Sequence, residues 1–265
     1  MLVCGTGRGS IYRALTYQQN DRPTEQAMYD FTDQVIIVTG GAGNLGQAVS
    51  RAFHAAGGRV AIMVRNRRDA VDAFGDDLPE GDTCAYIAGD LADESSVADM
   101  VREVMDKFGR IDALVNTAGG IRAGTPIHET PVDVWDFMVG LNARTVFLMS
   151  RAVIPHLLSR RHGRIISVSA RAALKGTARH GPYNAAKMAV IRLTETMAAE
   201  LRPHGITANC ILPGTIDTPA NRAETPDADF SRWVSPESIA GVILFLASEA
   251  AADVNGAAIP VYGRS

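Results

Sequence analysis

The sequence is poor in cysteine, has no long apolar run and shows no large excess of either charge. Its three cysteines, Cys4, Cys84 and Cys210, are far apart, which argues against a disulfide framework and a thiolate metal site and predicts a cytoplasmic protein. No apolar run reaches the roughly 18 residues that a membrane helix needs. A formal net charge of -3 with interspersed signs gives no footprint for nucleic acid or an anionic membrane. We therefore expect no metal, nucleic-acid or membrane partner.

The first thirty residues also lack a continuous apolar segment and a clear periodicity. They are typical of neither a signal peptide nor a core element, so we predict a flexible N-terminal extension over residues 1–30. Residues 31–265 show no composition break or internal repeat and are predicted to form a single domain.

From residue 34 onward, short apolar runs alternate with segments of helical periodicity. Strands that are apolar throughout and alternate with helices indicate a parallel sheet covered on both faces, hence an α/β, doubly wound fold with seven strands. The predicted strands are 34–40, 59–65, 84–91, 111–120, 164–169, 206–214 and 257–263. The predicted helices are 44–57, 95–109, 132–160, 183–205 and 235–250. Residues 217–236 show neither pattern, and a stretch of that length is typical of a functional lid.

A glycine-rich turn, TGGAGNLG at residues 39–46, follows the first strand and leads directly into a helix. Glycines such as Gly40, Gly43 and Gly46 allow tight turning, and the helix N-terminus offers free N–H groups to a pyrophosphate. This context predicts a dinucleotide site.

The end of the second strand favours NADP(H) over NAD(H). An acidic residue here would bind a free ribose 2′-hydroxyl, but the position holds Val64, followed by Arg65, Arg67 and Arg68. Arginine binds phosphate bidentately, so we predict that Arg65 contacts a 2′-phosphate. Arg67 or Arg68, taken singly, is better explained as part of a solvated loop.

Two further strand ends carry polar side chains. Asp90 is placed to accept from an adenine amino group, and Asn116 to lie beside the adenosine ribose, with Gly119 leaving room. Alternatively, Asp90 caps the next helix and Asn116 fastens a turn.

The motifs TGGAGNLG, GDL, NTAGG, LNARTVF, YNAAK and LPGTIDTP resemble, in order and spacing, those of the short-chain dehydrogenase/reductase family. The resemblance implies a Rossmann-type fold, a nicotinamide cofactor and a homo-dimer or homo-tetramer. It implies Tyr183 as catalytic acid/base, Lys187 as its partner and Asn142 as a proton-relay residue. The cofactor residues it implies are Gly40, Gly43, Asn44, Leu45, Gly46, Asp90, Leu91, Asn116, Ala118, Gly119, Tyr183, Lys187, Pro213, Gly214, Ile216 and Thr218, to which Arg65 is added.

Three positions depart from the family pattern. Thr117 replaces the second asparagine of the usual NNAG, which we expect to be tolerated. Asn44 replaces a glycine of the turn, and we expect the turn to survive because asparagine tolerates a left-handed backbone. The family's catalytic serine commonly lies thirteen residues before the tyrosine, which is Ala170 here. Ser169, one residue away, serves only if the strand end carries a bulge or the loop is one residue longer, because successive side chains on a strand point to opposite faces.

The segment around Ala170 also bears on the substrate. The ALKGT stretch and the lid sequence resemble quinonoid dihydropteridine reductase, in which alanine also stands at the serine position. Tyr183 and Lys187 share a helix face, so the ammonium is expected to lower the pKa of the phenol. In the lid segment, Arg222 is expected to pair with Asp227 or Asp229, or to touch the substrate.

These features leave three functions open. The first is an NADP(H)-dependent reductase of a ketone or 3-oxoacyl carbonyl, with Tyr183 as proton donor. The second is a reductase of a quinonoid pterin or similar imine. The third is a catalytically weak dinucleotide-binding regulatory protein.

Overall fold

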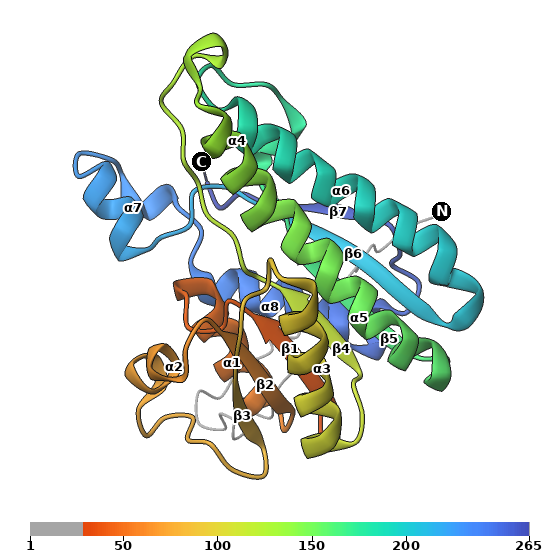
Figure 1. Cartoon of the computed structure of the whole chain (residues 1–265). Coiled ribbons are helices and arrows are strands. Elements are labelled where there is room, and N and C mark those ends of the chain that lie inside the picture. Colours follow the sequence, from red (N-terminus) through yellow and green to blue (C-terminus); the bar gives the residue numbers. More distant parts are fainter. Residues whose placement is uncertain (1–28, 265) are drawn as a thin grey trace, which may run out of the picture.

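The computed structural model describes residues 29–264, so the predicted extension lies almost entirely outside the described residues. A seven-stranded parallel sheet forms the centre, in the order β3-β2-β1-β4-β5-β6-β7 (Figure 1). The strands are β1 Val35–Thr39, β2 Arg59–Val64, β3 Cys84–Ala88, β4 Ala113–Asn116, β5 Gly163–Val168, β6 Ile206–Pro213 and β7 Ala258–Val261. The predicted α/β class and strand number are confirmed.

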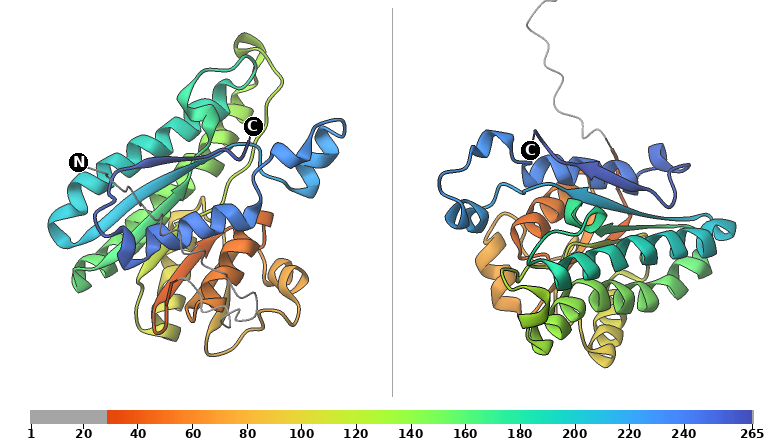
Figure 2. Two further views of the ribbon diagram at one scale, coloured as in Figure 1. Left: turned by 180° about the vertical axis from the view of Figure 1, so that it is seen from behind. Right: turned by 90° about the horizontal axis from the view of Figure 1, so that it is seen from above.

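Helices cover both faces of this sheet, as Figure 2 shows. The α-helices are α1 Asn44–Ala55, α2 Arg67–Phe74, α3 Glu94–Phe108, α4 Val132–Val139, α5 Thr145–Arg160, α6 Gly181–Leu201, α7 Pro219–Glu224 and α8 Pro236–Ala247. Short 3-10 turns lie at Ile127–Glu129, Arg171–Leu174, Arg202–His204, Phe230–Arg232 and Glu249–Ala251.

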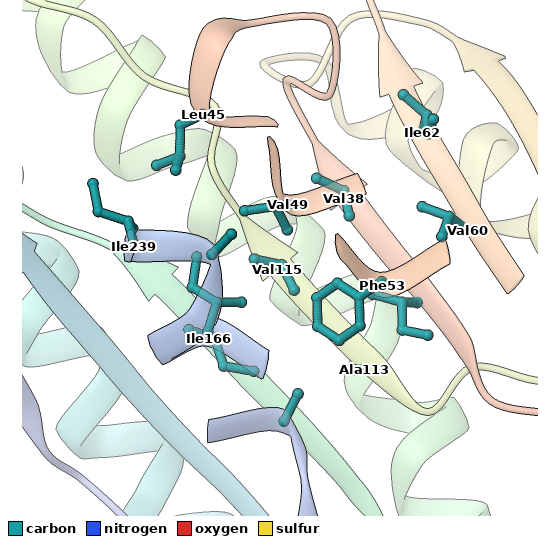
Figure 3. Close-up of a cluster of buried hydrophobic side chains, with 14 of the residues drawn as sticks. Val38, Leu45, Val49, Phe53, Val60, Ile62, Ala113, Val115, Ile166 and Ile239 are labelled. Carbon is teal, nitrogen blue, oxygen red and sulfur yellow. The ribbon is translucent and has the colours of Figure 1, made fainter. Parts of the chain in front are cut away.

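Alternating strand residues divide the interior into two cores. Ile36 and Val38 of β1 pack with α1 and α8 in the cluster of Figure 3, where Phe53 and Ile239 also lie. Val35 and Ile37 of β1 instead face α3, α5 and α6. Because β1, β2 and β4 to β6 are buried on both faces, their sequences are largely apolar, and this pattern predicted them. The edge strand β7 is only partly buried.

The predicted helix over residues 132–160 is interrupted. A π-helical turn, Gly140–Arg144, separates α4 from α5 and adds one residue to the helical repeat. By length and composition, residues 132–160 would be able to cross a membrane, although no single apolar run suggested it. Half of its most apolar part is buried inside the protein, and this is the core helix of the fold.

Two short helices were missed in the sequence. In α2 only Ala70 and Phe74 are buried, so its apolar periodicity is weak. In α7 no residue is buried. The helix is stabilised at its N-terminus, where the N-cap Thr218 accepts a hydrogen bond from the Asn221 amide. The lid segment, residues 217–236, therefore has local structure, contrary to our expectation, and α7 projects from the body of the domain (Figure 1).

Candidate active site

A cleft of about 990 Å³ opens at the carboxyl ends of the strands. The strand order reverses direction between β1 and β4, and in open parallel sheets ligands bind at such a switch point. The cleft is bordered by the glycine turn, by the segments after β2 to β6 and by α4, α6 and α7. All predicted site residues border it except Asn116 and Asn142.

The glycine turn is shaped for close approach of a ligand to the backbone. Gly40 has φ +61, and a Cβ there would lie 2.8 Å from the Cα of Ala118. A Cβ on Gly46 would lie 2.3 Å from the Gly40 carbonyl oxygen, so only glycine lets α1 begin this close to the turn. Asn44 is the first residue of α1 and is not left-handed, so its tolerance for that conformation is not what preserves the turn.

The N-terminus of α1 fits a pyrophosphate. Its N-cap, Gly43, offers no side chain to the first amides, and the first turn of the helix contains no acidic residue. These N–H groups therefore keep their hydrogen-bonding capacity and their partial positive charge for an anion in the cleft. The residues present here fit a dinucleotide.

Arg65 differs from the two arginines that follow it. Arg67 pairs with Glu80 at 3.4 Å and Glu103 at 3.3 Å, and Arg68 lies 3.8 Å from an Asp72 oxygen. Arg65 is exposed, borders the cleft and forms no ion pair with any residue from 29 to 264. Its guanidinium is thus available to an anionic ligand.

Asp90 borders the cleft and is not the helix cap. Its Oδ1 accepts from the Ala92 amide at 2.8 Å, while Asp93 caps α3 by accepting from Ser96 at 2.7 Å. The second carboxylate oxygen of Asp90 accepts no hydrogen bond within residues 29–264, which leaves it for the predicted adenine contact.

Asn116 does not border the cleft, and its side-chain bond lies within the sheet rather than in a turn. Its side chain is buried in the sheet, where Nδ2 donates to Ser167 Oγ at 3.2 Å and thereby joins β4 to β5. Its Oδ1 has no partner among the described residues.

Asn142 and Lys187 converge beside Gly119. A Cβ built on Gly119 would lie 2.9 Å from Asn142 Oδ1 and 3.0 Å from Lys187 Nζ, so both polar atoms approach one point that only glycine leaves open. Asn142 is fully buried in the π turn, where its Nδ2 donates to the carbonyls of Met138 and Gly120 at 3.0 Å. These backbone carbonyls fix the Asn142 side chain, which does not itself border the cleft.

Burial shifts the pKa values of the two α6 side chains that carry the predicted chemistry. Desolvation raises the pKa of Tyr183 to about 12 and lowers the pKa of Lys187 to about 8. We expected the ammonium to lower the pKa of the phenol, and the shift has the opposite sign. The cause is burial of the phenol, which favours its neutral form. Lys187 Nζ donates to the Val168 carbonyl at 2.9 Å.

Ser169 is not positioned as a catalytic serine. Although it borders the cleft, its hydroxyl is buried and donates to the Lys187 carbonyl at 2.7 Å. In this structure Ser169 joins β5 to α6, which does not favour the catalytic role predicted for it. Ala170 also borders the cleft and contributes only a methyl group.

The segment after β6 completes the cleft with Pro213, Gly214, Ile216 and Thr218. We expected Arg222 to pair with Asp227 or Asp229, but it pairs with Asp217 through two hydrogen bonds of 2.6 and 2.7 Å. This bidentate pair lowers the pKa of the Asp217 carboxyl and holds α7 to the base of the lid segment.

Several cleft residues carried no recognisable signal in the sequence. They come mainly from α4, the π turn, α7 and the turn after Ala170, and they are Asp136, Phe137, Leu141, Arg171, Ala172 and Glu224. A regular 3.6-residue repeat through residues 132–160 cannot identify the cleft-facing side, because the π turn shifts the phase of the helix.

Comparisons with known proteins agree with this geometry. Residues 34–229 match the family described as short chain dehydrogenase. The chain is 35% identical to the (2S)-[(R)-hydroxy(phenyl)methyl]succinyl-CoA dehydrogenase subunit BbsD of Thauera aromatica, covering 87% of this chain and 96% of that protein. It is 34% identical to a 3-oxoacyl-[acyl-carrier-protein] reductase of Synechocystis sp., covering 89% of this chain and 98% of that protein.

Solved structures lead to the same family. A short chain dehydrogenase from Bacillus anthracis superposes with a TM-score of 0.79 at 28% identity, covering 87% of this chain and 95% of that one. The comparisons give no specific support to the resemblance to quinonoid dihydropteridine reductase.

Proposed function

The chain belongs to the short-chain dehydrogenase/reductase family, and from this we propose that it is an NADP(H)-dependent reductase of a ketone or 3-oxoacyl carbonyl. The observation that carries the proposal is the convergence of Lys187 Nζ and Asn142 Oδ1 beside Gly119, which borders the same cleft as the glycine turn. A helix with tyrosine and lysine four residues apart is common, but this placement is not.

Tyr183 acts as the proton donor. With a pKa raised to about 12, the phenol is protonated throughout the neutral range and is able to donate to a carbonyl oxygen. Lys187, on the same helix face one turn later, stabilises the resulting phenolate by its positive charge. Asn142, held by Met138 and Gly120, would fix a water that links Lys187 to solvent and allows the proton to be replaced.

The cofactor is held along the cleft. Gly40 to Gly46 and the N-terminus of α1 would bind its pyrophosphate, and Asp90 its adenine. A bound nicotinamide supplies the hydride for reduction of the carbonyl. Arg65, without an acidic partner in the described part of the chain, supports a preference for the 2′-phosphate of NADP(H).

Ala170 favours an electrophilic carbonyl. A serine hydroxyl in its place would donate to the developing oxyanion, and loss of one such donor costs on the order of 100-fold in rate. A 3-oxoacyl thioester or an activated ketone tolerates that loss better than an unactivated ketone. Two of the relatives are named for acyl thioester substrates, which fits this choice.

The assembly proposed is a homo-dimer or homo-tetramer. Large apolar side chains on α4 and α5 are exposed in the single chain, among them Trp135 and Phe147, each more than 40% exposed. Apolar groups of this size are typical of surfaces that a second subunit covers. Cys84 and Cys210 are free, buried thiols, which is compatible with a cytoplasmic location.

The experiment is a screen for NADPH oxidation with ketones, 3-oxoacyl thioesters and quinonoid pterin. We expect turnover of at least one ketone or thioester, faster with NADPH than with NADH. Tyr183→Phe is expected to reduce turnover by about 100-fold or more while NADPH still binds. Tyr29→Phe, which alters a ring packed on Phe245, is the matched control. NADPH binding without turnover of any substrate would favour a regulatory dinucleotide-binding protein instead.

A further inference from the structure

Two loops lie together beside the cleft, and each contributes residues to its border. The first, residues 120–126, follows β4, and the second, residues 170–180, follows β5 (Figure 1). The Gly124 amide donates to the Arg179 carbonyl at 2.9 Å, which joins the loops. Ile121 from the first loop and Ala170 from the second border the cleft, so both reach the substrate side.

The charge of these loops has one sign. Neither loop contains an aspartate or glutamate, whereas together they carry Arg122, Arg171, Lys175 and Arg179. Arg122, Lys175 and Arg179 are exposed and have no acidic partner within residues 29–264. The acidic side chains on this side of the cleft come from helices, as Asp136 on α4 and Glu224 on α7.

Arg122 is held in place rather than free in solvent. Its guanidinium carbon lies 3.8 Å from the centre of the Phe137 ring, and its amide donates to Met138 Sδ at 3.2 Å. Phe137 borders the cleft, so the charge of Arg122 is held against a cleft-lining ring. Stacking on an aromatic ring leaves the edge of the guanidinium and its N–H donors free for an anion.

We propose that this loop pair, residues 120–126 and 170–180, is a subsite for an anionic group of the substrate, with Arg122 as its principal specificity-determining residue. The proposal rests on the proposed carbonyl reductase function and specifies its substrate class: a carbonyl compound with a carboxylate or phosphate remote from the reacting carbon. The carbonyl is at Tyr183, and the anion lies outward between Arg122 and Arg179.

The test uses pairs of substrates that differ in charge. Acetoacetyl-CoA is compared with the uncharged S-acetoacetyl-N-acetylcysteamine, and 5-oxohexanoate with its methyl ester. We expect kcat/KM of the unmodified enzyme to favour a charged member by about 10-fold at low salt, as for one charge-assisted contact at a partly exposed site. A preference confined to the thioester pair identifies a carrier phosphate, and one confined to the acid pair identifies a carboxylate.

Arg122→Gln should remove most of this preference by raising KM for the charged member, with kcat/KM for the uncharged member unchanged. Arg122→Lys should retain part of the preference, and Arg102→Gln, an arginine paired with Asp99 on α3, should retain all of it. Equal use of charged and uncharged members by the unmodified enzyme would overturn the proposal. A preference that persists in Arg122→Gln would do the same.

Failure of the reductase function itself is separable. If no carbonyl is turned over, calorimetric titration of coenzyme A and of 5-oxohexanoate into the NADPH-containing protein decides the question. Weaker binding of either anion by about 5-fold or more in Arg122→Gln supports the subsite. Equal binding by both proteins refutes it.

Discussion

Replacing Lys187 by methionine should stabilise the ligand-free protein while abolishing its activity. Lys187 is a buried ammonium whose one protein partner among the described residues is the Val168 carbonyl, at 2.9 Å. Desolvation lowers its pKa from 10.5 to about 8. Since one pKa unit corresponds to about 1.4 kcal/mol, the charged side chain costs about 3 kcal/mol of stability at neutral pH.

Methionine removes this penalty and fills a similar volume, but it loses the hydrogen bond to Val168, worth about 1–2 kcal/mol. The net expectation at pH 6.5 is a gain of about 1–2 kcal/mol in the free energy of unfolding. For a domain of this size that is a rise in Tm of about 2–6 °C.

The pH dependence of stability tests independently whether the buried Lys187 charge destabilises the protein. Below pH 8 the lysine is charged in both the folded and the unfolded chain, and the full penalty applies. Between about pH 8 and 10.5 the folded protein releases the proton while the unfolded chain keeps it, so the stability of the unmodified protein rises with pH. By pH 9.5 about 2 kcal/mol of the penalty should be gone, and the gain of Lys187→Met over the unmodified protein should disappear.

Urea unfolding at pH 6.5 and 9.5 measures both effects, with the exposed Lys107→Met as the control that should show neither. If Lys187→Met is destabilised at pH 6.5, the hydrogen bond outweighs the desolvation. If the difference between the two proteins does not change with pH, the lowered pKa is wrong.

The remaining predictions concern the cofactor, the proton transfer and the serine position. Arg65→Ala should erase most of a preference for NADPH over NADH, measured calorimetrically; an unmodified protein that binds both equally would contradict the role of Arg65. The reductase rate at saturating NADPH should fall as pH rises through about 8, because Lys187 loses its charge, and a flat profile to pH 9.5 would exclude this dependence. Ser169→Ala should cost about 1 kcal/mol of stability through the lost bond to Lys187 and leave most of the turnover; a loss of turnover as large as that of Tyr183→Phe would restore Ser169 as catalytic. Ala170→Ser should retain the fold and raise turnover of unactivated ketones, by supplying a donor at the oxyanion.

Much of the fold was determined by the sequence alone. A strand that is buried on both faces must be largely apolar, because it has no face in contact with water. For this reason β1, β2 and β6 were recognisable from their own residues alone. The glycine turn was recognisable as well, because the close approach of Gly46 to Gly40 excludes every other residue type. The segments that were missed, α2 and α7, bury almost nothing and therefore carry little apolar pattern.

The tertiary structure alone decided how side chains near the cleft are used. Ser169 and Asn116 lie at strand ends, as ligand-binding residues do. Yet the Ser169 hydroxyl donates to the Lys187 carbonyl, and the Asn116 amide donates to Ser167, both inside the protein. Sequence spacing specifies which residues follow a strand, but the packing of the next element decides whether a side chain points into the cleft or into the core. Arg122 and Arg179 lie 57 positions apart in the chain, and they share one mouth of the cleft only because β4 and β5 are neighbours in the sheet and end at the same edge.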